Sequence, residues 1–528
     1  MRIEHIAIVG GGTAGWLVAN HLGKALLARR EAGDPVSITV IESPDIPIIG
    51  VGEGTVPTLR ESLQGFGIDE SELFRCCDAS FKQSIKFVNW RDKVAFSQPN
   101  MQENAFHHLF DSPSPFGKDL SDYWLQLAAN TNMTRPYAEF VSPQYASCER
   151  NLAPKTVTSA QYKGAHGYAY HLDAAKFARL LKDNAINKYA VKCLSDTVVE
   201  VELAPNEEGI CALHTKQKGR LAFDFFVDCS GFAGLLMEKA LKVPFESKAK
   251  ALRMNKALVV QVPTDGQQPL PPYTLATAHQ AGWIWDIALP ERRGIGLVYC
   301  DDYLSDEEAK TKLNHYLGTS DYQANYRFLP MRVGHLQKFW HKNCVALGLA
   351  QGFLEPLEAT SILLTDFAAS FLARKFPMTV DDMAPLQQRF NRVMDTAWQR
   401  VIDFIQLHYF LSDRQDSGFW RDNHASWLDK RALSDIVIER LSLWQQFPPH
   451  PDDFFAQFEV FGVDNYLYLL YGMQFSTRNR IFTGSECSDS EGHVQKIRHA
   501  TQFLQGKLPA HRTLIEQIKQ SGFEKASF

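Results

Sequence analysis

The sequence offers little that would suit a membrane, a nucleic acid or a disulfide-stabilised fold. No stretch of about 18 uncharged apolar residues occurs, which argues against a transmembrane helix. No basic run interleaved with aromatic residues is present, which argues against nucleic acid as a partner. The nine cysteines are scattered without paired spacing, so we expect neither disulfides nor a metal site. The chain enters an apolar segment without a charged leader, so we expect a cytoplasmic protein that is not attached to a membrane.

The sequence also lacks internal repeats and low-complexity tracts. With 528 residues, the chain exceeds the roughly 250–300 residues at which a single core stops growing, so at least two modules are expected. A hydrophobic content of 45%, a charged content of 22% and a net charge of −5 describe an ordinary globular protein.

The first feature that is present is a dinucleotide fingerprint. The apolar run 6–9 leads into Gly-x-Gly-x-x-Gly and then into a helix expected from Trp16 to about Arg30. In this motif Gly10 allows a tight turn, Gly12 lets the backbone approach a pyrophosphate, and Gly15 lets the helix pack on the strand. The alternative is a glycine turn without a ligand. The motif is Gly10, Gly11, Gly12, Thr13, Ala14 and Gly15.

Further segments extend this nucleotide module. A second strand, 37–41, ends at Glu42, whose carboxylate would accept hydrogen bonds from ribose hydroxyls, although the 27-residue interval from Gly15 exceeds the usual ~20. A glycine-rich loop suits a backbone that passes close to a flat cofactor. Its central residues are Gly50, Val51, Gly52 and Glu53. Strands at 223–232 and 344–348 end in further glycine turns.

Two segments carry candidate chemistry outside the fingerprint. Lys82 and Lys86 share one face at either the strand or the helical period, and a solvated face is the simplest interpretation of the pair. A helix expected over 362–376 begins where Thr360 or Ser361 would cap it, and free backbone N–H groups there would suit a small anion. The aromatic, irregular stretch 91–160 is more typical of a binding wall than of a linker.

These elements predict an α/β fold: a doubly wound, glutathione-reductase-like FAD module with an inserted antiparallel sheet, followed by a mainly helical C-terminal cap. The inserted strands are expected at 254–262, 282–287 and 294–299. We expect the module over 1–375 and the cap over 376–528. A second nucleotide fingerprint is missing, so electrons would come from a separate reductase or a transient nicotinamide.

Several motifs in order resemble the flavin-dependent tryptophan halogenase family, and the resemblance covers most of the chain. The matching segments are Gly10 to Trp16, Gly50 to Glu53, Phe81 to Trp90, Trp283-x-Trp285-x-Ile287, Phe353 to Glu358, Asp403 to Tyr409 and Phe419 to Asp422.

The resemblance implies an FADH2-dependent halogenase that is related to flavin monooxygenases. Reduced FAD and oxygen would oxidise bound chloride or bromide to hypohalous acid, which would pass through a tunnel to Lys82 beside an aromatic substrate. Lys82 thus becomes a catalytic candidate, while Lys86 keeps the surface interpretation. Glu358 would stabilise the cationic intermediate or take its proton. A wall of Trp283, Trp285 and Ile287 would separate substrate from flavin, and the same stripe is also typical of plain core.

The resemblance also assigns cofactor, halide and substrate contacts. Leu349 joins the FAD-binding residues, and backbone N–H groups of Thr360 and Ser361 would face the halide. The family pattern has serine and glycine where this chain has Ala359 and Ser361, which leaves the choice of halide open; losing the glycine would reshape the loop. His108, Phe110 and Tyr466 are the candidate substrate contacts.

Other interpretations of the whole chain remain open at this point. An indole-like or other electron-rich aromatic is the expected substrate rather than free tryptophan, because Asn465, Tyr466 and Tyr468 stand where a tryptophan clamp would be. A separate NAD(P)H-dependent flavin reductase is the expected partner, and a homodimer is one possible assembly. A flavin monooxygenase that inserts oxygen and a non-catalytic flavin-binding protein are the alternatives.

Overall fold

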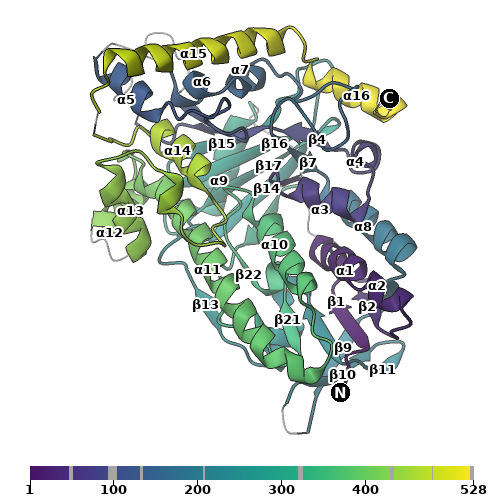
Figure 1. Ribbon diagram of the computed structural model, residues 1–528. Coiled ribbons are helices and arrows are strands. Elements are labelled where there is room, and N and C mark those ends of the chain that lie inside the picture. The colour runs from purple at the N-terminus through teal and green to yellow at the C-terminus, as the bar shows by residue number, and fades with distance from the viewer. Residues whose placement is uncertain are drawn as a thin grey trace. The chain divides into compact units, whose positions relative to one another are not determined.

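The computed structural model describes residues 1–46, 52–92, 104–130, 135–205, 208–318, 325–428, 433–478 and 480–523 (Figure 1). The chain divides into two compact units, each built from three separate stretches. The first unit comprises Met1–Asp78, Leu172–Leu252 and Met331–Gln399, and the second unit comprises Ala79–His171, Arg253–Pro330 and Arg400–Phe528. The units therefore alternate along the chain. The division into functional modules at 375/376 stays a prediction.

The first unit is built on a six-stranded sheet in the order β20-β21-β12-β1-β2-β8. Pairing is parallel from β21 to β8, and only the edge strand β20 is antiparallel. The central strands are almost continuously apolar and buried, as expected for a parallel sheet covered on both faces. The strands are β1 (His5–Val9), β2 (Ser37–Glu42), β8 (Lys192–Ser195), β12 (Phe225–Asp228), β20 (Trp340–His341) and β21 (Cys344–Ala346).

Helices of the first unit pack around α1, which contacts both α8 and α10. The main helices are α1 (Thr13–Ala25), α2 (Leu27–Glu31), α3 (Leu59–Phe66), α4 (Glu70–Cys76), α8 (Ala174–Tyr189) and α10 (Thr360–Arg374). Two small sheets complete the unit. Their strands are β9 (Val198–Leu203), β10 (Ile210–Thr215) and β11 (Gly219–Ala222), and then β13 (Phe245–Ser247), β19 (Gly334–Leu336) and β22 (Gly352–Phe353). Strands β9 and β10 pair in an antiparallel hairpin.

Two expectations about helix starts are wrong. The helix after the fingerprint begins at Thr13 rather than Trp16, because Gly12 is already its N-cap residue. Helix α10 is capped by neither Thr360 nor Ser361. Its N-cap residue is Ala359, whose left-handed backbone (φ 56°) turns the chain into the helix without a side-chain hydrogen bond.

The second unit is built on a seven-stranded sheet in the order β18-β14-β17-β16-β15-β5-β6. All its pairs are antiparallel except β15 with β5, so the expected antiparallel insertion is confirmed. Its strands are β5 (Ser84–Val88), β6 (Ala105–Leu109), β14 (Lys256–Pro263), β15 (Tyr273–His279), β16 (Gly282–Ala288), β17 (Arg292–Tyr299) and β18 (Arg327–Pro330). A separate antiparallel pair joins β4 (Ser80–Lys82) to β7 (Ala169–Leu172).

The segment 81–90 is not one element, and the expected shared face of its two lysines is wrong. Gln83 separates β4 from β5, and these two strands belong to different sheets. Lys82 is buried with 1% of its surface exposed, whereas Lys86 is half-buried and its Nζ lies 2.8 Å from Glu149 Oε1. Because the two lysines lie on strands of different sheets, a single period across the segment does not apply.

The stretch 91–160 is more regular than expected, because it contains β6 and three helices among its described residues. In Figure 1, α15 runs along α6 and α7, which it contacts. The C-terminal stretch is mainly helical, as predicted, although α12 and α16 were not anticipated. The helices are α5 (Ser121–Asn130), α6 (Tyr137–Val141), α7 (Gln144–Glu149), α9 (Asp306–Tyr316), α11 (Met383–Phe410), α12 (Gly418–Leu428), α13 (Asp435–Trp444), α14 (Val463–Gly472), α15 (Gly484–Gln505) and α16 (His511–Ser521). Within the described residues, every helix is too short or too polar to span a bilayer.

Candidate active site

The loop between β1 and α1 is a cradle in which Gly10 and Gly15 leave no room for a side chain. Gly10 has φ +119°, and a Cβ there would lie 2.1 Å from the carbonyl oxygen of Cys229. A Cβ on Gly15 would lie 1.9 Å from the carbonyl oxygen of Gly10, so helix and loop are in close contact. Gly12 faces open space, with no atom within 4 Å of an added Cβ, and no side chain caps α1. An open glycine at an uncapped helix start fits a pyrophosphate.

Glu42 lies at the end of β2, directly beside this cradle. A Cβ on Gly11 would lie 2.3 Å from the Cβ of Glu42, so the glutamate side chain passes over the loop. Its carboxylate forms an ion pair with Lys182 of α8. The second oxygen of this fixed carboxylate can accept hydrogen bonds from ribose hydroxyls.

A second loop approaches the start of α1 within the same unit. The short 3₁₀ helix Gly348–Ala350 follows β21, and Gly348 has φ +66°. A Cβ on Gly348 would lie 2.5 Å from the Cβ of Ala14, so this loop touches the first turn of α1. Leu349 and Phe232 line a hollow on this side, and Phe232 makes an edge contact with Phe353 at 5.7 Å between ring centroids. The hollow is lined by glycine backbone and aromatic rings, which suit an isoalloxazine ring, and also by the ion pair of Glu238 and Arg332.

The glycine-rich loop at 50–57 is described only in part. Gly50 and Val51 lie outside the described residues. Gly52 has φ +121°, a conformation that favours glycine. Burial raises the pKa of the neighbouring Glu53 carboxyl to about 7. This carboxyl group can therefore donate a hydrogen bond near neutral pH.

The residues present fit FAD, with the pyrophosphate at the cradle, a ribose at Glu42 and the ring near Leu349. Bound as FADH2, the cofactor supplies the two electrons that the reduction of oxygen requires. The protein would contribute the positioning of the cofactor.

The segment Glu355-Pro-Leu-Glu358 precedes α10 and places two acidic side chains in the interior. Glu355 has no exposed surface and Glu358 has 2%. The left-handed residue here is Ala359, whereas Ser361 lies in the first helical turn. The substitution of a family glycine by Ser361 therefore places no positive φ on a serine.

Lys82 is the central group of the second unit. It ends β4, and its Nζ lies 5.3 Å from the ring centroid of Phe110, a cation–π distance. His171 lies close to the same ammonium, and His511 lies against Phe81, the preceding residue of β4. Burial and then the charge of Lys82 lower the pKa of His171 well below its ordinary value. Burial likewise lowers the pKa of His511 to about 4, so both imidazoles are neutral.

His511 holds the strand that carries Lys82. The backbone N–H of Phe81 donates to Nε2 of His511 over 2.9 Å, and Nδ1–H of His511 donates to the carbonyl of Leu270 over 2.9 Å. These two bonds fix the tautomer, because Nε2 must accept and Nδ1 must donate. Protonation of His511 would remove the acceptor for Phe81.

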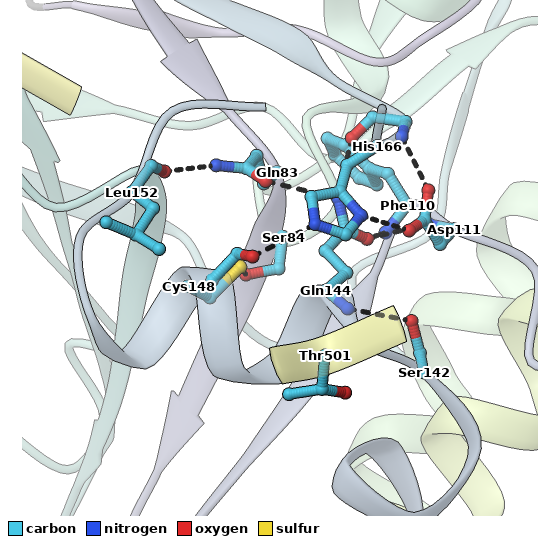
Figure 2. A network of polar contacts seen from close by, with 12 residues as sticks. Gln83, Ser84, Phe110, Asp111, Ser142, Gln144, Cys148, Leu152, His166 and Thr501 are labelled. Carbon is cyan, nitrogen blue, oxygen red and sulfur yellow. Dashed lines mark hydrogen bonds and ion pairs between the residues drawn. The ribbon is translucent and has the colours of Figure 1, made fainter. Parts of the chain in front are cut away.

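A buried polar network fixes the backbone that presents Phe110 (Figure 2). The Gln144 amide oxygen accepts from the backbone N–H groups of Phe110 and Asp111, at 3.0 and 2.8 Å. The amide nitrogen of Gln144 donates to the carbonyl of Gly167 over 2.7 Å. His166 Nδ1 pairs with the Asp111 carboxylate at 2.7 Å. Hydrogen bonds from the side chains of Gln144 and His166 therefore fix the loop at Phe110 and Asp111, which lies beside Lys82.

The tryptophan wall lies on β16. Trp283 and Trp285 are buried with ring centroids 6.1 Å apart, and Ile287 continues the stripe. Trp285 covers Gly296 of β17, where an added Cβ would lie 2.0 Å from the indole ring. The end of the wall is joined to β4, because the hydroxyl of Ser80 donates to the carbonyl of Ala288 over 2.8 Å.

The substrate candidates of the second unit lie in one aromatic cluster. Phe404 makes ring contacts with His108 at 5.9 Å and with Tyr466 at 4.9 Å. His108 Nε2 lies 3.0 Å from the side-chain nitrogen of Asn465. The hydroxyl group of Tyr466 is buried and has no hydrogen-bond partner among the described residues. His108 and Tyr466 are thus brought together, with Phe110 beside Lys82.

The supporting residues around Lys82 left no signal in the sequence. His511 follows Phe81 by 430 positions, and Gln144 lies in a stretch that was expected to be irregular. Neither residue belongs to a motif with a fixed spacing. The packing of His511 against β4 could be found only once the C-terminal helix was placed.

The glycine cradle and the parallel sheet define a dinucleotide-binding α/β protein. The sequence profile of the tryptophan halogenase family matches residues 5–485, and the chain therefore belongs to that family. Tryptophan 6-halogenase ThaL from Streptomyces albogriseolus is 34% identical over 98% of this chain and 99% of that protein. The crystal structure of the tryptophan halogenase from Shewanella frigidimarina has a TM-score of 0.92 at 36% identity, covering 99% of each chain.

A further solved structure connects the family to its cofactor. Tar14, described as a tryptophan C-6 flavin-dependent halogenase (chlorinase) from taromycin biosynthesis, has a TM-score of 0.87 at 31% identity. The alignment covers 98% of this chain and 100% of that one. The fold class and the enzyme class predicted from the sequence are thus confirmed. The protein is a flavin-dependent halogenase that uses FADH2 and a halide ion.

Proposed function

We propose that this enzyme halogenates an indole-like aromatic compound in the second unit, beside Lys82. The observation that carries this proposal is the setting of Lys82: a buried ammonium facing Phe110, with the neutral imidazole of His171 close by and that of His511 bonded to the preceding residue, Phe81. The Phe110 ring beside Lys82 belongs to the unit that also holds His108 and Tyr466.

Lys82 is proposed to activate hypohalous acid. Its ammonium donates a hydrogen bond to the oxygen of the acid, so that the O–X bond is polarised and the halogen becomes electrophilic. Alternatively, the neutral amine takes the halogen and releases water. In either route the aromatic carbon gains the halogen and loses a proton, and the net change is hypohalous acid plus arene giving haloarene plus water. Glu358 is proposed as the acceptor of that proton.

The cofactor and halide contacts are proposed for the first unit. FAD is assigned to Gly10, Gly12, Thr13, Ala14, Gly15, Glu42, Gly50, Val51, Gly52, Glu53 and Leu349. The halide is assigned to the backbone N–H groups of Thr360 and Ser361. Trp283, Trp285 and Ile287 are proposed to separate the aromatic substrate from the flavin, which would suppress direct oxygen transfer.

The substrate class is proposed from the aromatic cluster. Relatives are named for tryptophan, and an indole ring would suit contacts with His108, Phe110 and Tyr466. Because Asn465 already lies against His108, we propose an indole-like compound other than free tryptophan. A separate NAD(P)H-dependent flavin reductase and a cytoplasmic location complete the proposal. A homodimer stays a prediction.

The test uses the full chain with FAD, NADH, a flavin reductase, oxygen and either bromide or chloride over a panel of indoles and tryptophan. Mass spectrometry should reveal products with the isotope pattern of one halogen, which disappear when halide is omitted. A halide-independent product heavier by one oxygen would instead identify a monooxygenase. Flavin binding without any product would identify the non-catalytic alternative.

A further inference from the structure

A small hollow lies at the start of α10, within the first unit. It is formed by the loop after β21, by β22 and by the first turn of the helix. The lining includes Gly348, Gln351, Phe353, Thr360, Ser361 and Trp398. Two of these side chains carry polar atoms that no described residue satisfies.

Trp398 is the first of them. The side chain is 1% exposed, yet its Nε1–H has no hydrogen-bond partner among the described residues. The ring is held by a stacked contact with Phe339 at 5.9 Å and a contact with His335 at 5.2 Å. A buried donor without an acceptor is costly and therefore uncommon in folded proteins. Because Trp398 lines the hollow, its N–H can donate a hydrogen bond to an acceptor that binds there.

Gln351 is the second. It is also 1% exposed, and its Oε1 is without a partner in the described part of the chain. Rotation of the amide by 180° exchanges this oxygen with the NH₂ group, so the same position can present a donor. The hollow can thus offer a second side-chain donor.

The helix start supplies donors of the same kind. No side chain caps α10, whereas α9 and α15 each begin with a capping box. The first backbone N–H groups of α10 therefore lack a side-chain acceptor, and the helix dipole favours a negative charge there. The hollow thus offers several hydrogen-bond donors: the helix start, the indole N–H of Trp398 and the Gln351 amide. Such a set of donors suits a small anion rather than a cation.

We propose that Trp398 and Gln351 complete the halide pocket, with the indole N–H of Trp398 as a direct ligand of chloride or bromide. This inference rests on the proposed function, in which Thr360 and Ser361 hold the halide. It adds two side chains that tune the affinity and the choice of halide. The two ligands come from segments outside the Glu355 to Ser361 motif.

The test replaces the indole N–H and keeps an aromatic ring. In the full chain, Trp398→Phe should weaken binding of bromide and chloride by about ten-fold, the loss expected for one hydrogen bond to a charged group. Binding is measured without FAD or aromatic substrate, by calorimetry and by the rise in melting temperature with added halide. The melting temperature without halide should not fall, since the removed donor has no partner.

Trp340→Phe is the matched control, because Trp340 is equally buried and its Nε1–H donates to the carbonyl of Lys342 over 2.9 Å. It should lower the melting temperature and leave halide binding unchanged. Gln351→Glu should weaken halide binding further, because a carboxylate repels the anion, while Gln351→Leu should have an effect similar to that of Trp398→Phe.

The outcomes separate this inference from the proposed function. Unchanged halide affinity in Trp398→Phe and in Gln351→Glu would overturn the inference while halogenation by the wild type stands. Weakened halide binding together with oxygenated products from the wild type would support the pocket and refute the halogenation. A wild-type protein that binds no halide would overturn both.

Discussion

The two units present their candidate sites by different means. In the first unit the candidate site is built from the main chain: glycines at 10, 12 and 348 leave the backbone accessible or in close contact, and the starts of α1 and α10 have no side-chain caps. In the second unit side chains from distant segments hold Lys82 and Phe110. His511 and Gln144 each bond to backbone groups next to these two residues.

This difference decides how each site responds to substitution. A backbone site fails through steric overlap or through loss of access, so single added methyl groups should have large and local effects. A site held by side chains fails through unsatisfied hydrogen bonds, which cost about 1–3 kcal/mol each and are partly shared within a network. Paired variants in the two units can measure this contrast.

The largest effect is expected for Lys82→Met, which removes the ammonium and keeps an unbranched chain. Halogenation should fall by about 10²–10⁴-fold, the range for loss of a group that transfers or holds a proton. FAD binding should be unchanged. Product formation by mass spectrometry and FAD binding by fluorescence give the two readouts.

Lys86→Met is the control for Lys82→Met. It removes a half-buried lysine four positions later that pairs with Glu149, and it should retain most of the activity. Equal losses in both variants would contradict a specific role of Lys82.

The second-largest effect is expected for Gly12→Ala in the first unit. Gly12 has an ordinary extended backbone (φ −80°) and open space around an added Cβ, so the apoprotein should fold with an unchanged melting temperature. FAD affinity should nevertheless fall by roughly ten-fold or more, because the methyl group occupies the space proposed for the pyrophosphate. Titration of FAD by calorimetry measures the affinity.

Gly10→Ala provides the contrast to Gly12→Ala. Its Cβ would overlap the carbonyl oxygen of Cys229, so it should destabilise the apoprotein itself. If Gly12→Ala binds FAD like the wild type, the cradle does not hold the pyrophosphate.

The same contrast explains what the sequence could predict. The backbone site of the first unit follows from local spacing: β1, Gly10 to Gly15 and α1 are consecutive, and Glu42 closes the next strand. The support of Lys82 could not be found in this way, because β4 depends on a histidine 430 positions away. The cap of α10 was mispredicted because Ala359 takes a left-handed conformation, which sequence propensity assigns to glycine or asparagine.

A smaller effect is expected for Gln144→Leu in the second unit. The backbone N–H of Asp111 would lose its acceptor, and the unfolding free energy should fall by about 1–3 kcal/mol. Halogenation should fall several-fold because the loop that presents Phe110 loosens. Denaturant unfolding and steady-state rates measured on the same preparation provide the comparison.

Gln144→Glu separates positioning from stability alone. One carboxylate oxygen can still accept from Phe110 and Asp111, whereas the bond to the Gly167 carbonyl is lost. Relative to Gln144→Leu, we expect Gln144→Glu to restore the halogenation rate more than the free energy of unfolding. Gln495→Leu, on the half-exposed face of α15, is the control and should change neither quantity.

The smallest effect concerns Glu53, whose carboxyl group follows the glycine-rich loop assigned to FAD. Its folded pKa of about 7 lies above the ordinary 4.5, so between these values the folded apoprotein binds more protons than the unfolded chain. The wild type should therefore lose stability as pH rises from 4.5 to 7, by on the order of 1–3 kcal/mol. Glu53→Gln should remove this decline and equal the wild type at the acidic end. Denaturant unfolding across that pH range measures the free energy of unfolding of the wild type and of Glu53→Gln, with Glu61→Gln, at an exposed position, as the control. If the stability of the wild type and of Glu53→Gln changes with pH in the same way, the Glu53 carboxyl group is not buried. The first unit then relies on its backbone alone.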